Sequence, residues 1–185
     1  MFILIEEALK KGKGKISIRG WVYRERKQKD MVFLVIRDSS DIIQAVIKQD
    51  KVSKKEWEDA NKILIESSLE LEGELKEDKR APTGYEIQVS KLNVIQFADV
   101  FPIKKDQSPE LLLDYRHLWL RSRKMSAVMK VRSTVMKAYR DYYYSKKFYE
   151  MAPQIFTPTA CEGGTDLFEV KYFDKKVYLT QSWQL

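Results

Sequence analysis

The amino-acid sequence predicts an α+β protein: a five-stranded β-barrel comes first, then a linker and the opening helix and strands of a second, antiparallel domain. Three observations predict this class. Apolar and polar residues alternate through residues 1–101, a single capped helix interrupts the alternation, and a long helical stripe follows a proline-containing segment. Because 185 residues exceed the usual domain of about 100–150, we expect a barrel domain at 1–103, a linker at 104–120 and part of a second domain at 121–185.

Alternation defines the strands of the barrel. The expected strands are Lys15–Arg24, Met31–Arg37, Ile42–Lys48, Ser68–Leu75 and Tyr85–Val94. Between the third and the fourth, Ser53 and Glu56 fit a capping box, in which each side chain satisfies a free backbone donor of the other residue, so a helix to about Leu64 is expected. Five strands with a helix between the third and the fourth is the order of an OB-fold, a Greek-key barrel that binds oligonucleotides.

The second half begins with a segment that has no periodicity. Residues 101–114 are charged and contain Pro102 and Pro109, which predicts a linker. The helical stripe that follows consists of Val128, Val131, Val135, Tyr139 and Tyr142, at spacings of three and four. We expect this helix to end near Phe148, before Pro153. Two strands are expected after it, at Leu167–Phe173 and Lys176–Gln181.

Composition excludes several kinds of site. Cys161 and His117 are the only cysteine and the only histidine, so neither a disulfide framework nor a Cys/His zinc site is possible, and no metal site is predicted. No apolar run approaches the roughly 18 residues that a membrane span requires, and the short acidic N-terminus does not fit a signal peptide. A soluble, cytoplasmic protein without membrane contact is therefore expected.

The charge favours a polyanionic partner. The formal net charge is +7 and the sequence pI is near 9.3. Nine Lys and Arg side chains lie between Lys10 and Lys29, where Glu25 is the only acidic residue, whereas acidic residues gather later, around 56–59 and 66–78. We therefore expect one strongly positive face on the barrel. Charge alone does not separate a nucleic acid from a membrane surface.

One family resemblance is carried by three runs of the barrel, which are Gly20–Arg26, Val32–Asp38 and Ile42–Gln44. Together they resemble the anticodon-binding domain of the class II aminoacyl-tRNA synthetases for Asp, Asn and Lys. The resemblance implies that Arg26, Phe33 and Gln44 contact the middle anticodon base, a uridine. The residue types suit this role, because a base can stack on Phe33 while Arg26 and Gln44 hydrogen-bond its edge. From the residues alone, a core Phe33 and a solvated Gln44 are the simpler interpretation.

Further tracts resemble the asparaginyl branch of this family, and they are Phe101–Ile103, Asp106–Glu110 and His117–Ser122. Lys147–Pro153 resembles motif 1 of the class II enzymes, in which a long helix joins a strand at an obligatory proline, here Pro153. In the family this segment is the core of a two-fold dimer interface, so the resemblance implies a homodimer. Lys147 departs from the pattern, since the family commonly has Gly there.

Two segments near the end of the chain, Cys161–Phe168 and Thr180–Leu185, resemble the amino-acid site of the Asp and Asn enzymes. The resemblance implies that the substrate is bound by Glu162, Ser182 and Gln184, and that a mobile lid is formed by Gly163, Gly164 and Thr165. A carboxylate such as that of Glu162 suits the ammonium group of an amino acid. Trp183 and Asp166 depart from the family, and an extra carboxylate in the lid bears on the discrimination of Asn from Asp.

The resemblance implies an asparagine–tRNA ligase, which uses ATP and Mg²⁺ to form asparaginyl-adenylate and then transfers asparagine to tRNA(Asn). The family's motifs 2 and 3, which hold ATP, would lie beyond Leu185. The 185 residues are therefore expected to contain an incomplete catalytic domain that is inactive alone. Two alternatives stay open: an aspartyl-tRNA synthetase, including one that charges both tRNAs, and a non-catalytic OB-fold protein that binds tRNA or another RNA.

Overall fold

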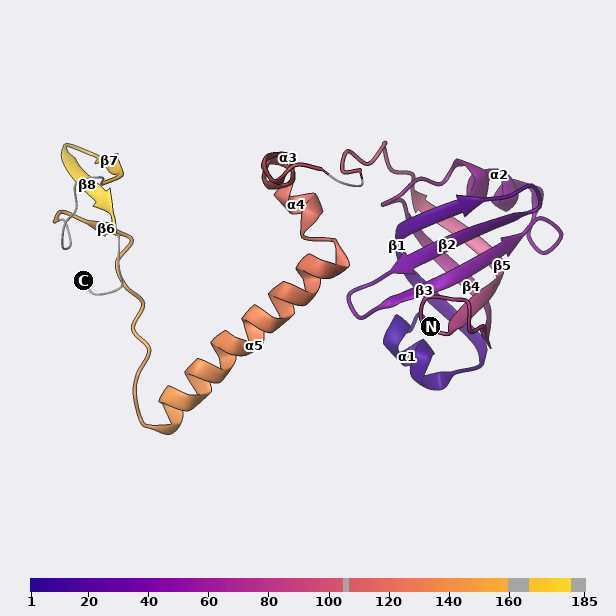
Figure 1. The fold of residues 1–185 in the computed structure, drawn as a ribbon, viewed down its shortest axis with the longest axis horizontal. Coiled ribbons are helices and arrows are strands. Elements are labelled where there is room, and N and C mark those ends of the chain that lie inside the picture. The colour runs from indigo at the N-terminus through magenta and orange to yellow at the C-terminus, as the bar shows by residue number, and fades with distance from the viewer. Residues whose placement is uncertain (105–106, 160–166, 181–185) are drawn as a thin grey trace. The chain divides into compact units, whose positions relative to one another are not determined.

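The computed structural model describes residues 1–104, 107–159 and 167–180. The chain divides into two compact units, Met1–Tyr115 and Arg116–Leu185. Figure 1 shows a β-barrel in the first unit and a long helix followed by a small sheet in the second. These features confirm the predicted α+β class.

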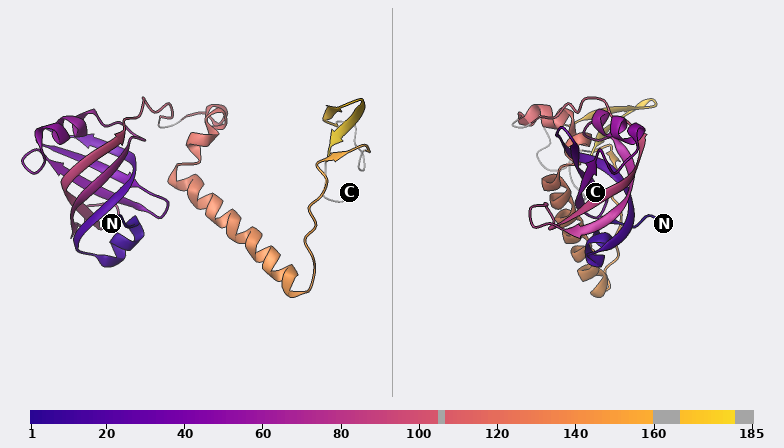
Figure 2. Two further views of the ribbon diagram at one scale, coloured as in Figure 1. Left: turned by 180° about the vertical axis from the view of Figure 1, so that it is seen from behind. Right: turned by 90° about the vertical axis from the view of Figure 1, so that its right-hand side faces the viewer.

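The first unit is a closed five-stranded barrel. Its strands are β1 (Gly14–Lys27), β2 (Met31–Arg37), β3 (Ile42–Lys48), β4 (Ser68–Glu77) and β5 (Tyr85–Gln96). They follow one another around the barrel in the order β1-β2-β3-β5-β4, and β4 pairs with β1 to close it. Only the β3–β5 pair is parallel. The views in Figure 2 show the strands curving into this closed form. All five predicted strands and the OB-fold order are confirmed.

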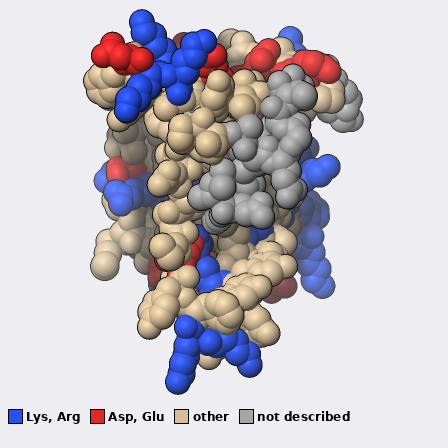
Figure 3. Space-filling model, turned by 90° about the vertical axis from the view of Figure 1, so that its left-hand side faces the viewer, with Lys and Arg blue, Asp and Glu red and all other residues tan. Residues whose placement is uncertain are grey.

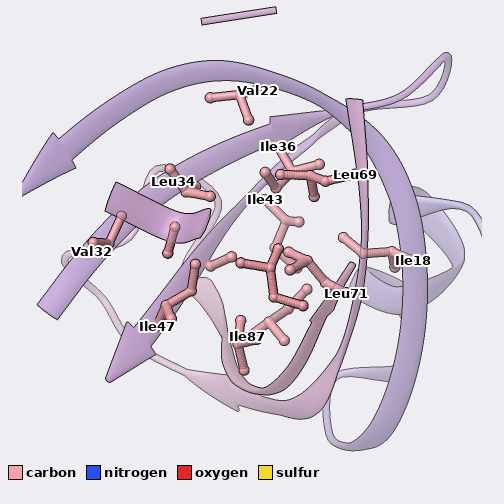
Figure 4. Packing of buried hydrophobic residues seen from close by; sticks show 14 of the residues in the cluster. Ile18, Val22, Val32, Leu34, Ile36, Ile43, Ile47, Leu69, Leu71 and Ile87 are labelled. Carbon is pink, nitrogen blue, oxygen red and sulfur yellow. The ribbon is translucent and has the colours of Figure 1, made fainter. Parts of the chain in front are cut away.

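Inward-facing side chains of every strand fill the barrel. Figure 4 shows Ile18, Ile36, Ile43, Leu71 and Ile87 converging from different strands on one apolar centre. Each of these side chains is at most 1% exposed. A large aliphatic side chain contributes about 1.5–3 kcal/mol when it is removed from water, so this cluster is the main source of stability of the first unit.

A helix that the sequence analysis did not predict covers part of this core. α1 (Ile5–Lys11) buries Ile5 and Ala8 completely. Its free N-terminal donors are satisfied by the turn between β2 and β3, because Asp38 Oδ2 accepts from the Ile5 N–H at 2.7 Å and Ser40 Oγ accepts from the Glu6 N–H at 3.0 Å. These acceptors lie more than thirty residues away in sequence. A local cap is present as well, because Glu7 Oε2 accepts from the Leu4 N–H at 3.0 Å.

The predicted capping box is present in α2 (Lys54–Lys62), which lies between β3 and β4. Ser53 Oγ accepts from the Glu56 N–H at 3.3 Å, and Glu56 Oε2 accepts from the Ser53 N–H at 2.8 Å. The other oxygen of Glu56 accepts from the Leu92 N–H at 2.9 Å. One carboxylate therefore both caps the helix and fastens it to β5.

The segment predicted as an unstructured linker contains two short helices, α3 (Pro109–Asp114) and α4 (Arg116–Trp119). Ser108 caps α3, and Pro109 stands at its first position, where the missing N–H costs no hydrogen bond. Sequence analysis counted Pro109 among the features of a linker, whereas at this position proline is compatible with a helix start.

The second unit consists of α5 (Arg123–Ser145) and a three-stranded sheet. The strands of the sheet are β6 (Phe156–Thr157), β7 (Glu169–Tyr172) and β8 (Lys175–Leu179), in the order β6-β8-β7. The two strands predicted at Leu167–Phe173 and Lys176–Gln181 are confirmed with different bounds, and the two-residue β6 was not predicted. The predicted long helix is confirmed as well, although it ends at Ser145 and not near Phe148.

The end of α5 explains the departure at Lys147. The Phe148 N–H donates to the Tyr143 carbonyl at 3.1 Å and the Lys147 N–H donates to the Tyr144 carbonyl at 3.0 Å, which is a Schellman motif. The rings of Phe148 and Tyr143 pack edge to face with centroids 5.5 Å apart. Lys147 itself has φ +64°, a left-handed conformation that favours glycine. The turn that the family makes with Gly is therefore formed here, with strain, by Lys.

None of the residues of α5 is buried. The exposed fraction of the side chain reaches 64% at Val131 and at Tyr139. Within the described part of the chain, no helix is both long and apolar enough to span a membrane.

Candidate nucleic-acid interface

A β-bulge in β1 changes which of its side chains face outward. Val22 pairs with Ile36 but Arg24 pairs with Val35, so Tyr23 is an extra residue on β1. Even-numbered side chains face the core as far as Val22, which is fully buried. Beyond the bulge the alternation is shifted by one residue, and the even-numbered Arg24 faces outward beside the half-buried Val35.

Two rows of side chains cross the outer faces of β1, β2, β3 and β5 beyond this bulge. The first row consists of Arg24, Val35, Gln44 and Glu86, and the second consists of Arg26, Phe33, Val46 and Gln88. Successive members of a row are direct partners in the strand pairing, so their side chains lie beside one another on one face of the sheet. The register therefore brings Arg26, Phe33 and Gln44 together on one surface.

Both rows line an open groove with a volume of about 640 Å³. Asp78 and Arg80, from the loop between β4 and β5, line it as well. Val46 forms part of its floor and is only 3% exposed, although it lies on the outer face. In an OB-fold, oligonucleotides bind to the face of strands 2 and 3 and to the loops beside it. The groove lies on that face.

Phe33 lies in the wall of the groove and not in the core cluster, so the interpretation of Phe33 as a core residue is wrong. The Arg26 guanidinium carbon lies 4.8 Å from the centroid of the Phe33 ring, in a cation–π contact. One aromatic face and five N–H donors are thus held together at the same place. An unstacked base needs both kinds of contact, a flat surface and groups that hydrogen-bond its edge.

Sequence analysis missed Glu86 and Gln88, which belong to the groove. Glu86 Oε2 accepts from Gln44 Nε2 at 2.9 Å, and Glu86 Oε1 accepts from Gln88 Nε2 at 2.6 Å. The alternation of β5 contained a signal for them, because they flank the buried Ile87 and therefore share the opposite face of the strand. The sequence did not show that this face of β5 lies beside Gln44 and Val46 of β3, because the parallel pairing of the two strands joins residues about forty positions apart.

Charges of both signs meet at the groove. Arg24, Arg26 and Lys48 contribute positive charge from the strands. Arg80 is held in the β4–β5 loop by Asp78, which accepts from its Nε at 3.1 Å and its Nη2 at 2.9 Å. The hydrogen bond from the Arg80 side chain lowers the pKa of Asp78 below its ordinary value. The basic side chains can contact a phosphate backbone, while the amides and Phe33 can contact bases.

The residues predicted for the amino-acid site lie outside the described part of the chain. These residues are Glu162, Gly163, Gly164, Thr165, Ser182 and Gln184. Their predicted roles therefore stay predictions. Among the described residues, no three His, Cys, Asp or Glu side chains lie close enough together to hold a metal ion.

A second surface feature lies at the end of α5, close to Pro153 in sequence. Aromatic and aliphatic side chains line an open pocket of about 400 Å³, and its lining residues are Met136, Tyr139, Arg140, Tyr143, Tyr144, Phe148, Tyr149 and Glu150. Arg140 donates to both oxygens of Glu150 at 2.9–3.1 Å, and the side-chain hydrogen bond from Arg140 lowers the pKa of Glu150. Figure 3 shows one face of the molecule, on which uncharged residues lie between groups of basic and acidic side chains.

Two protein-family descriptions match the chain. Residues 16–95 match the OB-fold nucleic acid binding domain, and residues 108–185 match the class II tRNA synthetases (D, K and N). The first range covers the barrel strands, and the second covers α5 and the small sheet.

Curated relatives and solved structures agree with these matches. The asparagine–tRNA ligase of Thermoplasma acidophilum is 47% identical over 170 residues, and that of Thermococcus gammatolerans is 50% identical over 171 residues; each alignment covers 92% of this chain and 40% of the relative. The crystal structure of asparaginyl-tRNA synthetase from Pyrococcus horikoshii complexed with asparaginyl-adenylate matches with a TM-score of 0.88 and 43% identity, over 100% of this chain and 43% of that one. The chain thus spans about 40% of the length of the curated relatives that it matches.

Proposed function

Because the chain belongs to the class II tRNA synthetases of the D, K and N type, and corresponds to the N-terminal region of the asparaginyl enzymes, we propose that its barrel binds the anticodon loop of tRNA(Asn) and that the whole protein is an asparagine–tRNA ligase. The observation that carries the first part is the convergence of Arg26, Phe33 and Gln44 on one groove of the barrel.

In this proposal the middle anticodon base stacks on Phe33, and Arg26 and Gln44 hydrogen-bond its edge. The two rows of the groove support this arrangement, because Arg26 and Phe33 are direct partners in the strand pairing and Gln44 lies one row away. Stacking of a base on an aromatic side chain contributes about 1–3 kcal/mol to binding. The basic side chains of the groove add an attraction to phosphates that weakens as salt is raised.

Aminoacylation by the whole protein would proceed in two steps. Asparagine's carboxylate attacks the α-phosphate of ATP in the presence of Mg²⁺ and displaces pyrophosphate. A hydroxyl of the terminal ribose of tRNA then attacks the carbonyl of the adenylate and displaces AMP. We assign Glu162, Ser182 and Gln184 to asparagine binding, with Gly163, Gly164 and Thr165 as the lid. We further propose that this chain alone binds RNA without forming an adenylate, because it spans only about 40% of the length of the asparagine–tRNA ligases that it matches.

We also propose that α5, together with Pro153 in the segment that follows it, forms a homodimer interface. Its support is the exposure of the helix, on which Val131 and Tyr139 are each 64% exposed, and the open aromatic pocket at its end. A self-complementary apolar surface suits a two-fold dimer. Sedimentation equilibrium of the chain and of Tyr139→Asp tests this proposal, since a monomeric wild type would contradict it.

The decisive test of anticodon binding is a titration of the chain with the anticodon stem-loop of tRNA(Asn) at fixed salt. Phe33→Ala should weaken binding by about 1–3 kcal/mol. Phe2→Ala is a matched control, because Phe2 is also an exposed ring beneath an arginine, with the Arg19 guanidinium carbon 5.6 Å from its centroid, but it does not line the groove. Equal affinities for the two variants would refute the proposal.

Amino-acid specificity is tested separately with the whole protein. ATP–pyrophosphate exchange should depend on asparagine and not on aspartate. Exchange that is driven by aspartate would identify an aspartyl enzyme instead. ATP–pyrophosphate exchange requires no tRNA, so its result does not depend on the anticodon proposal.

A further inference from the structure

The groove contains an acidic residue at a place where an RNA-binding surface would ordinarily avoid negative charge. Glu86 lies in the same row as Gln44 and Arg24, and it accepts hydrogen bonds from two glutamine amides. Building on the anticodon function proposed above, we propose that Glu86 is a positioning residue that sets the base specificity of the groove by fixing the orientation of the Gln44 and Gln88 side chains.

The chemical basis is the difference between a carboxylate and an amide. A primary amide presents a carbonyl acceptor on one side and an NH₂ donor on the other, and it can turn over with little change of shape. An ionised carboxylate only accepts. Both oxygens of the Glu86 carboxylate accept a hydrogen bond from an amide nitrogen. Oε2 accepts from Gln44 Nε2 at 2.9 Å, and Oε1 accepts from Gln88 Nε2 at 2.6 Å. Neither amide can turn over without bringing two acceptors together.

The backbone makes this arrangement rigid. Gln44 and Glu86 are direct partners in the parallel pairing of β3 with β5, and Gln88 follows two positions later on the same face. All three side chains are half-buried. A hydrogen bond to a charged group is stronger than one between neutral groups, so the orientation of the two amides is well determined.

A fixed amide changes what the groove can recognise. Gln44 directs its NH₂ group to Glu86, which leaves the carbonyl oxygen as its free acceptor, and Arg26 in the neighbouring row offers donors only. Uracil presents the acceptor O4 next to the donor N3–H, whereas cytosine presents the donor N4–H₂ next to the acceptor N3. A donor and an acceptor in a fixed order therefore match uracil and oppose cytosine, because the order on cytosine is reversed.

The same physics predicts what happens when the carboxylate is replaced by an amide. In Glu86→Gln, each partner amide can adopt either orientation, because the new side chain both donates and accepts. The groove then offers a donor or an acceptor at the Gln44 position as the base requires. Selectivity for uracil should fall while stacking on Phe33 and attraction to phosphates are retained.

The experiment uses the full 185-residue chain and two synthetic anticodon stem-loops that differ only in uridine or cytidine at the middle anticodon position. The wild type should bind the uridine hairpin about tenfold more tightly, the discrimination expected of one well-made pair of hydrogen bonds. Glu86→Gln should reduce this ratio to near one. Glu72→Gln is the matched control, since it removes the same charge from an exposed site that pairs with Lys91 at 3.4 Å and does not line the groove.

Thermal melting of each variant identifies a loss of folding, and Glu86→Ala provides a second variant that removes the carboxylate without adding a donor. A selectivity ratio that survives in both Glu86 variants while Phe33→Ala still weakens binding would overturn the role of Glu86 and leave anticodon binding intact. A wild type that binds neither hairpin would overturn both proposals. An equal drop of selectivity in Glu72→Gln would show that net charge, and not the orientation of the amides, sets the ratio.

Discussion

Gly73 lies where β4 and β5 approach each other too closely for any side chain. A Cβ atom at this position would lie 2.3 Å from the carbonyl oxygen of Gln88 and 2.7 Å from Cγ2 of Ile87. Neither atom can retreat easily, because Gln88 belongs to a paired strand and Ile87 is fully buried. The β-bulge between Glu72 and Gly73 is part of the same close contact. We therefore expect Gly73→Ala to destabilise the barrel.

The magnitude follows from two opposing terms. Forcing an extra methyl group into a packed core costs about 1–3 kcal/mol, and contact with backbone atoms favours the upper end of that range. Replacing Gly by Ala in a strand with ordinary φ recovers about 0.5–1 kcal/mol, because the unfolded chain loses freedom. The net loss is about 2 kcal/mol. For a domain of this size each kcal/mol corresponds to about 4–8 °C, so the melting temperature should fall by about 10 °C.

The assay is a thermal melt of the chain followed by near-ultraviolet circular dichroism. Gly84→Ala is a control with a different mechanism, because a Cβ there meets nothing within 4 Å but the residue has φ +79°. It should lose about 1–2 kcal/mol through backbone strain alone. A Gly73→Ala protein that melts within two or three degrees of the wild type would refute the steric argument.

Three further predictions concern the hydrogen bonds of the helices. Burial acts to raise the pKa of Asp38, but hydrogen bonds from the Ser40 hydroxyl and from three backbone N–H groups outweigh it and lower the pKa. The stability that Asp38 contributes is therefore complete above the unfolded pKa of about 3.9 and is lost as pH falls through the lower folded value. The urea midpoint should decline below about pH 4 less steeply in Asp38→Asn than in the wild type. Glu56→Ala should lower the free energy of unfolding, measured by urea denaturation, by about 1–3 kcal/mol. Ser53→Ala should lower it by only about 1 kcal/mol, because the loss of Glu56 also leaves the Leu92 N–H without its acceptor. Lys147→Gly should relieve about 1 kcal/mol of strain and slow amide hydrogen exchange at Phe148, whereas faster exchange would contradict the strain argument.

Much of the barrel could be predicted from local patterns. The inward residues of β4, Leu69, Leu71 and Leu75, recur at even spacing and are at most 1% exposed, so alternation alone placed them in the core. The capping box of Ser53 and Glu56 is equally local, and it begins α2 as expected. Where both partners of an interaction lie within a few residues, the sequence contains the whole signal.

The elements that sequence analysis missed depend on distant partners. α1 is a short helix whose Ile5 and Glu6 N–H groups are satisfied by Asp38 and Ser40 of the β2–β3 turn, in addition to the local contact of Glu7 with the Leu4 N–H. Glu86 appeared to be an ordinary polar residue of a strand, and its role as the acceptor for Gln44 depends on the parallel pairing of two strands far apart in the chain. Long-range pairing is not encoded in any single window of sequence.

The bulge at Tyr23 shows how a small local feature decides the chemistry of the site. Strict alternation, continued past Val22, would direct Arg24 and Arg26 into the apolar core, where an unpaired guanidinium is very costly. The strand expected from the sequence ends at Arg24, three residues before the observed end of β1. One extra residue resolves the conflict, since it shifts the alternation and turns both arginines to the face that carries Phe33 and Gln44. The cluster inferred from a family resemblance thus has a physical origin in the register of a single strand.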